Sequence, residues 1–175
     1  VLQSGEAMTG PFYSAWMTHS VYADAQLRER MAFALSQIFV VSLQENSVRN
    51  RPYGAAGYND MLKANAFGSY EQLLTDVSKS PVMGTYLSHL KNQANQFDND
   101  GNLVASPDEN YAREVMQLFS IGMVELHPDY SLKLGSDGLP IQTYTQEDIT
   151  ELARVFTGWS YATQAINDGA TPGGT

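Results

Sequence analysis

The segment from Ser106 to Gly122 constrains the fold most, because it carries the signals that begin a helix in the expected order. Ser106 can cap free backbone amides, Pro107 suits the first helical position, and Glu109 lies three residues after the cap, as in a capping box. At 100° per residue, the polar side chains fall within an arc of about 140°, and the apolar residues lie outside it. The polar arc consists of Glu109, Asn110, Arg113, Glu114, Gln117 and Ser120. The segment therefore predicts an amphipathic helix with one polar face.

Further helix signals precede and follow this segment. Capping residues, proline and glycine predict helices at residues 12–21, 25–42, 58–67, 70–78, 81–93 and 146–157. A Gly-Ser-Asp-Gly turn between residues 130–134 and 139–144 predicts a β-hairpin, whereas residues 96–105 predict a loop. We therefore expect a mainly α, bundle-like fold with one small β-hairpin. The chain opens on Val1 and ends in a glycine-rich run, so we expect a single partial domain whose residues 1–10 and 162–175 are disordered or truncated ends.

Residues 31–41 form the most apolar run, and their apolar side chains surround the helix axis. This pattern predicts the most buried helix, with the core built around it. Arg30 and Gln37 share one face of that helix, and a buried guanidinium and a buried amide both need partners. We expect carboxylates of the 107–122 helix to supply them. The predicted structural polar network is Arg30, Gln37, Asn110, Arg113 and Gln117.

The polar arc has three interpretations. It could be a solvated face in which Glu109 and Arg113 pair at i, i+4, or a buried network that fixes the helix to its neighbours. It could also hold an acid–base pair, with Glu109 and Glu114 as catalytic candidates. His89 is a third catalytic candidate, but it lies at the edge of an apolar stripe, where a packed and hydrogen-bonded histidine is the usual finding. Composition alone favours the solvated face.

The run from Asp98 to Asn102 suggests calcium, because hard cations prefer clustered oxygen atoms. The register of an EF-hand fails, however, since Leu103 stands where glycine is needed. An irregular site would use Asp98, Asp100 and Asp108, but runs of Asp, Asn and Gly more often form turns. The three histidines are isolated in sequence, which gives no support for zinc. We therefore predict a turn, no metal and no cofactor.

Charge and composition exclude several classes of function. The chain has 10 Lys and Arg against 19 Asp and Glu, a net charge of −9, which disfavours binding to nucleic acid or to an anionic membrane surface. It has no cysteine, so disulfides and thiolate chemistry are excluded from it. Its longest apolar run is shorter than the roughly 20 residues of a membrane span, and no signal peptide is visible.

Four ordered segments resemble the bacterial family known as domain of unknown function 1800. They are LRERMAFALSQIFVVS at 27–42, YNDMLKANAFGSYEQLLTDVSKSPVMGTYLSHL at 58–90, PDENYAREVMQLFSIGMVEL at 107–126 and PIQTYTQEDITELARVFTGW at 140–159. The resemblance covers nearly all of the chain from about Trp16 onward. It implies that the chain is an internal fragment of a longer, exported protein, located in the periplasm or secreted. Members are often encoded beside exported proteins that resemble the sulfatase and alkaline-phosphatase superfamily.

The family has no agreed catalytic residues, so the resemblance assigns none here. Because it repeats the polar positions of the 107–122 helix, it favours the buried network over the solvated face. We therefore expect a non-catalytic interaction or scaffold module of an exported bacterial system, with a sulfatase-like partner. The alternative is a hydrolytic or lyase-type enzyme that uses Glu109, Glu114 or His89 together with residues absent from this chain.

Overall fold

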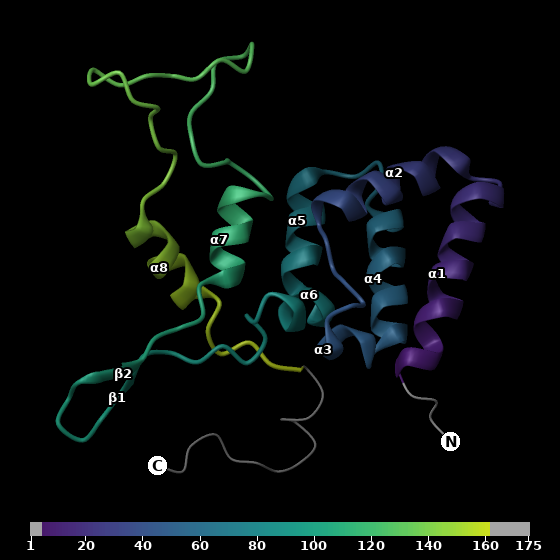
Figure 1. The fold of residues 1–175 in the computed structure, drawn as a ribbon, viewed down its shortest axis with the longest axis horizontal. Helices are drawn as coiled ribbons and strands as arrows, with labels where there is room; N and C mark the ends of the chain where they lie inside the picture. Colours follow the sequence, from purple (N-terminus) through teal and green to yellow (C-terminus); the bar gives the residue numbers. More distant parts are fainter. Residues whose placement is uncertain (1–4, 162–175) are drawn as a thin grey trace.

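The computed structural model describes residues 5–161, which form eight helices and one two-stranded antiparallel sheet (Figure 1). The helices in chain order are α1 (Gly5–Tyr22), α2 (Gln26–Ile38), α3 (Asn46–Arg49), α4 (Pro52–Ala64), α5 (Tyr70–Lys79), α6 (Pro81–Tyr86), α7 (Asn110–Gln117) and α8 (Gln146–Val155). The strands β1 (Gln96–Phe97) and β2 (Leu103–Ala105) lie between α6 and α7. The expected mainly α fold with a small hairpin is confirmed.

The helices form two groups along the long axis of the molecule. In Figure 1, α1 lies at one end beside α4, α2 crosses the top of both, and α7 and α8 pair at the other end. The segment between α7 and α8 extends away from the helices as an arm, defined here as residues 121–143. α1 begins at Gly5, so residues 5–10 are helical where we expected a disordered or truncated end. Residues 1–4 and 162–175 lie outside the described part of the chain.

The main core lies between α4, α5, α6 and α7. Its fully buried side chains include Leu62 of α4, Val77 of α5, Met83 of α6 and Tyr111 of α7. Phe39, just after α2, joins this cluster and accepts a hydrogen bond from the Tyr58 hydroxyl at its carbonyl oxygen, 2.9 Å away. The core is therefore assembled from short helices around α4 rather than around residues 31–41.

The prediction that residues 31–41 form the most buried helix was wrong. Met31, Phe33, Ile38 and Val40 are 38% to 44% exposed, and the buried residues of α2 itself are Glu29 and Ala32. α2 packs against α1 and α4, and these neighbours cover only part of its circumference. The segment with apolar side chains on all sides therefore forms a helix on which several of these side chains are partly exposed.

The capping residues of α5 and α8 act as the sequence indicated, whereas the cap predicted for α7 does not form. The Ser69 hydroxyl accepts the Gln72 amide at the start of α5, and Thr145 with Asp148 forms a complete capping box on α8. α7, however, begins at Asn110, later than the predicted start. The carboxylate of Asp108 accepts the Asn110 amide at 2.8 Å, a role that the sequence had given to Ser106.

The hairpin lies elsewhere than predicted. β1 and β2 pair across residues 98–102, where we expected a loop, and Gly101 adopts a φ of +84° in the turn. In the arm, the Gly135 amide donates to the Leu139 carbonyl at 2.8 Å, so the predicted turn forms. Its flanks make only isolated antiparallel bridges, among them Leu134 with Pro140. Pro140 has no N–H to donate, which interrupts a regular ladder at this point.

Candidate functional site

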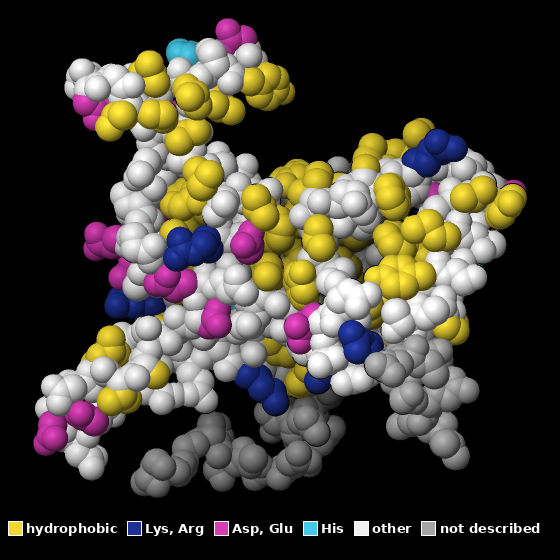
Figure 2. Space-filling view, in the orientation of Figure 1, with side chains coloured by type: hydrophobic (Ala, Val, Ile, Leu, Met, Phe, Trp, Pro, Cys, Tyr) yellow, Lys and Arg dark blue, Asp and Glu magenta, His cyan; other side chains and the backbone are white. Residues whose placement is uncertain are grey.

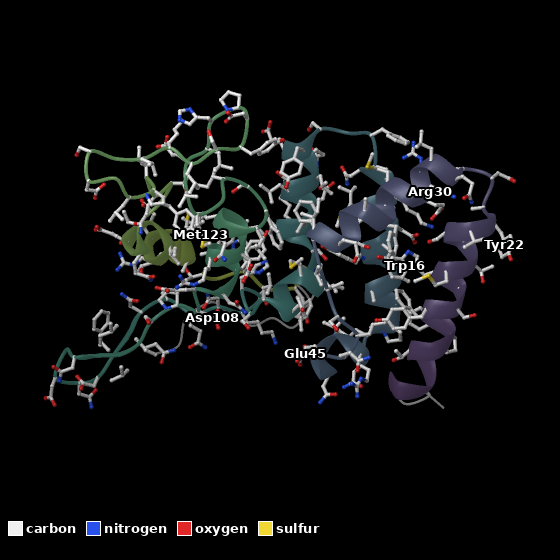
Figure 3. All side chains as sticks on the ribbon, turned by 45° about the horizontal axis from the view of Figure 1, so that its top comes forward. Trp16, Tyr22, Arg30, Glu45, Asp108 and Met123 are labelled. Carbon is white, nitrogen blue, oxygen red and sulfur yellow. The ribbon has the colours of Figure 1, made fainter. Side chains whose placement is uncertain are left out.

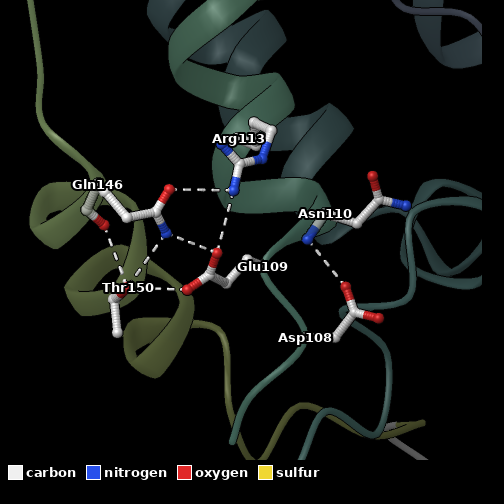
Figure 4. A network of polar contacts seen from close by, with 6 residues as sticks. All are labelled: Asp108, Glu109, Asn110, Arg113, Gln146 and Thr150. Atoms are coloured by element: carbon white, nitrogen blue, oxygen red, sulfur yellow. Dashed lines mark hydrogen bonds and ion pairs between the residues drawn. The ribbon is translucent and has the colours of Figure 1, made fainter.

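Glu109 is the centre of a polar network that joins α7 to α8 (Figure 4). Its Oε1 accepts the Thr150 hydroxyl at 2.8 Å, and its Oε2 accepts the Gln146 amide at 2.9 Å and the Arg113 guanidinium at 3.1 Å. Arg113 also donates to Gln146 Oε1 at 3.3 Å. The Thr150 hydrogen bond, with those of Gln146 and the Arg113 charge, lowers the pKa of Glu109. Both oxygens are thus engaged by fixed donors, and the carboxylate is held in its charged form.

The expected pairing of Arg30 and Gln37 with the α7 carboxylates is not formed. Both side chains are exposed, and Figure 3 shows Arg30 on α2, at the opposite end of the molecule from α7. Among the described residues, Gln37 donates only to the neighbouring Ser36 hydroxyl, at 3.2 Å. Of the other predicted members, Arg113 belongs to the Glu109 network. Asn110 offers only its backbone amide to Asp108, and Gln117 takes no part in the network of Figure 4.

The buried charge of α2 is Glu29, one residue before the predicted Arg30. Its Oε1 lies 3.0 Å from Lys63 Nζ of α4, while its Oε2 is buried and has no partner among the described residues. Arg28 donates to the Lys63 carbonyl at 2.8 Å. A shift of one residue turns a side chain by 100° around the helix, which is why Glu29 points inward and Arg30 outward. Sequence reasoning missed this pair, since only the packing of α2 on α4 reveals it.

His89 lies in an aromatic cluster and is only 2% exposed. Its ring centroid is 3.9 Å from that of Tyr111, 5.6 Å from that of Phe156 and 6.4 Å from that of Trp159. Nε2 lies 2.9 Å from the Ser78 carbonyl oxygen, which can only accept, so Nε2 carries the proton. Nδ1 is buried without a partner among the described residues. Burial lowers the pKa of His89, which keeps the imidazole neutral.

Tyr111 connects the His89 cluster to α5. Its hydroxyl lies 2.7 Å from the Ser78 hydroxyl, and burial raises its pKa to about 12. A pocket of about 320 Å³ lies beside this cluster, lined by Ser80, His89, Trp159 and other residues of the same segments. The cluster is mostly apolar and has few free polar groups. Its arrangement therefore fits a role in core packing better than a role in acid–base chemistry.

Asn92 holds the segment after His89 in place, and sequence reasoning missed it. The buried Asn92 side chain donates to the Asp108 carbonyl at 3.0 Å and accepts the Asp108 amide at 2.8 Å. Its backbone carbonyl accepts the Gly158 amide, and the Lys91 amide donates to the Trp159 carbonyl at 2.8 Å. Three separated segments of the chain therefore meet at one buried amide, directly before α7.

The three catalytic candidates do not form a joint site. Glu109 is bound to α8, and His89 is stacked within the aromatic cluster. Glu114 is half-buried, and its Oε2 has no partner among the described residues. No hydrogen bond or ion pair links any two of these three side chains within residues 5–161. The arrangement lacks the mutual contacts of an acid–base or nucleophilic constellation.

Two of the three candidate calcium ligands, Asp98 and Asp108, accept hydrogen bonds from the chain itself. Asp98 Oδ1 accepts the amides of Asp100 and Asn102, and Oδ2 accepts the Asn102 side chain at 3.0 Å. These bonds, led by that of the Asn102 side chain, lower the pKa of Asp98. Asp108 is separately engaged at the start of α7. In the described part of the chain, no group of three or more His, Asp or Glu could hold a metal ion.

The fold and the site define a mainly α-helical domain whose charged and polar clusters connect helix to helix. None of the helices within residues 5–161 is long and apolar enough to cross a membrane. The family model described as "Protein of unknown function (DUF1800)" matches residues 3–173, and the chain therefore belongs to this family. No curated protein matches the chain, and no solved structure does either.

Proposed function

We propose that the chain is a non-catalytic interaction module of an exported bacterial system, and that it binds a protein partner. The observation that carries this proposal is the arm, residues 121–143. It is held by backbone hydrogen bonds, such as those of the Glu125 amide to Ile141 and of the Lys133 amide to Glu125. It nevertheless presents large apolar side chains to solvent. These side chains are between 37% and 83% exposed, and they belong to Ile121, Met123, Leu126, Tyr130, Leu132, Leu134, Leu139 and Ile141.

Exposing the apolar side chains of such an ordered arm to water is unfavourable in free energy. Figure 2 shows hydrophobic side chains gathered along the arm, where it extends from the helices. Contiguous exposed apolar surface commonly marks a contact with another macromolecule. Within residues 5–161 the arm has isolated backbone bridges but no sheet beside it, so a partner could cover its apolar side chains without any rearrangement of the helices.

The polar network supports a non-catalytic role. Glu109, a carboxylate candidate for acid–base chemistry, is held by Arg113 and by Thr150 in contacts that fix α8 against α7. α7 and α8 flank the arm on both sides, so their attachment determines where the arm begins and ends. A network that positions an interaction surface needs no open cleft.

We propose a member of the sulfatase and alkaline-phosphatase superfamily as the partner, and a periplasmic or secreted location. This part rests on the family resemblance, in which such exported proteins are often encoded nearby. The module would serve as a scaffold for that partner rather than process its substrate.

Direct binding tests the proposal. The 175-residue chain is mixed with the sulfatase-like protein encoded in the same gene neighbourhood, and association is measured by analytical ultracentrifugation. We expect a complex that Leu134→Asp combined with Leu139→Asp disrupts. The matched control is Leu27→Asp, because Leu27 is also exposed but lies on α2. A complex unaffected by the arm variant, or no complex at all, would contradict the proposal.

The alternative is a hydrolytic or lyase-type enzyme completed by residues that this chain does not carry. The observation that favours it is that two buried atoms, Glu114 Oε2 and His89 Nδ1, have no hydrogen-bond partner in the described part of the chain. Glu114→Gln and His89→Gln in the full-length protein distinguish the two functions. Retained stability and partner binding with loss of a measured activity would favour the enzyme.

A further inference from the structure

A groove runs between α1 and α4, apart from the arm and from the α7–α8 network. It has a volume of about 380 Å³, within the range of small-molecule pockets. The two helices run in the same direction in Figure 1, and each contributes one face at helical spacing. Ala15 of α1 and Ala56 of α4 line it between larger residues, and these small side chains leave the space open.

One end of the groove is aromatic. Phe12 and Trp16 line it from α1, and Tyr53 lines it from α4, together with Pro11 inside α1 and Pro52 at the start of α4. The ring centroids of Phe12 and Trp16 are 6.2 Å apart, and Figure 3 shows Trp16 between α1 and α4. A second hollow of about 250 Å³ lies on another side of Phe12 and Trp16, so these rings are not tightly enclosed. Close-packed interiors rarely leave this much room.

The other end of the groove is polar and negatively charged. Asp60, Lys63 and His19 line it, all from the C-terminal halves of their helices. The Lys63 charge is compensated, because its Nζ lies 3.0 Å from Glu29 Oε1. No ion pair or hydrogen bond of the Asp60 carboxylate is formed with the described residues. The net charge of −9 also makes the surroundings favourable to cations.

We propose that this groove binds small molecules that have an apolar body and a cationic ammonium end. The body lies against Phe12, Trp16 and Tyr53, whose rings offer both apolar contact and cation–π attraction. The ammonium group meets the Asp60 carboxylate, which no cation of the described chain neutralises. An anionic ligand of the same size loses this contact and faces repulsion.

Fluorescence of Trp16 reports on the groove directly. The chain has two tryptophans, so Trp159→Phe leaves Trp16 as the only one. This variant of the 175-residue chain is titrated with benzyltrimethylammonium, with benzyl alcohol and with benzylsulfonate. We expect a saturable change in Trp16 emission with the cation, at an affinity about tenfold above that of the neutral and anionic probes.

Two variants and one control make the outcome decisive. Asp60→Asn should lower the affinity for the cation by about tenfold, to that of benzyl alcohol. Ala56→Phe should abolish binding of all three probes, with circular dichroism checking that the helices remain. Asp100→Asn, on the β1–β2 turn, is the control and should leave the affinity unchanged. Equal binding of the three probes, no saturable binding, or an unaffected Asp60→Asn variant would overturn the proposal.

Discussion

Glu109 shows how one side chain can resemble a catalytic acid in sequence and act as a connector in structure. The i, i+4 spacing to Arg113 is visible in the sequence, and this pair is formed. The contacts with Thr150 and Gln146 are not visible, because they depend on the docking of α8, more than thirty residues later. Local spacing therefore predicts the intrahelical half of the network, and only tertiary structure reveals the other half.

Replacing Glu109 should loosen the α7–α8 contact. In Glu109→Gln, an NH2 group replaces one of the two acceptor oxygens, so it faces either the Thr150 donor or the Gln146 and Arg113 donors. We expect the free energy of unfolding to fall by about 1 kcal/mol, discounted because the side chain is 31% exposed. The control Glu151→Gln breaks an exposed pair with Arg154 and should cost less than about 0.5 kcal/mol. Equal effects in chemical denaturation would show that Glu109 is no more than a surface charge.

His89 should make stability depend on pH in a defined direction. Burial lowers its pKa in the folded state, so the unfolded chain binds the proton more readily. The contribution of neutral His89 to the free energy of unfolding is therefore fully present above the unfolded pKa of about 6.5. It is lost as the pH falls below that value. Between about pH 7.5 and pH 5.5, the free energy of unfolding should decrease in the wild type and change less in His89→Phe. An equal decrease in the wild type and in His89→Phe would contradict this assignment.

At the scale of the element, the sequence predicted the helix caps of α5 and α8, but it did not predict which helix is most buried. The caps of α5 and α8 follow from Ser69 and Thr145, whose partners lie three residues away. The all-round apolar pattern of α2 reports which residues are apolar but not how many neighbours exist to cover them. β1 has only two residues, too few for an alternation of apolar and polar side chains to be recognised. The residues of the Asp98 turn predicted a turn from the local sequence. The pairing of β1 with β2 across that turn could not be predicted in the same way.

Two core variants should separate the burial of α4 from that of α2. Leu62 on α4 is fully buried, so Leu62→Ala should lower the free energy of unfolding by about 2–5 kcal/mol. Phe33 on α2 is 40% exposed and contacts Trp16 at a ring distance of 5.8 Å. Phe33→Ala should therefore cost only about 1 kcal/mol. Urea denaturation checks both values, and a larger loss for Phe33 than for Leu62 would contradict the core described here.

At the scale of the whole molecule, exposed apolar surface and negative charge occur together. The apolar side chains of the arm and of α2 leave much hydrophobic surface on a chain with a net charge of −9. The charge opposes association with polyanions and keeps copies of the chain apart, while the apolar arm favours a specific partner. The two features together favour recognition through apolar contacts rather than through charge.

The same balance of charge predicts that the chain does not bind nucleic acid at physiological salt. Binding to DNA or RNA requires clustered Lys and Arg that release counterions from the phosphates, and 10 such residues stand against 19 acidic ones. Among the described residues, Lys63, Arg113, Lys133 and Arg154 already pair with carboxylates. In fluorescence anisotropy, labelled single-stranded and double-stranded oligonucleotides should show no saturable binding of micromolar protein. A salt-sensitive, sub-micromolar affinity for either oligonucleotide would refute the prediction, because it would require a basic surface that the charges of this chain do not provide.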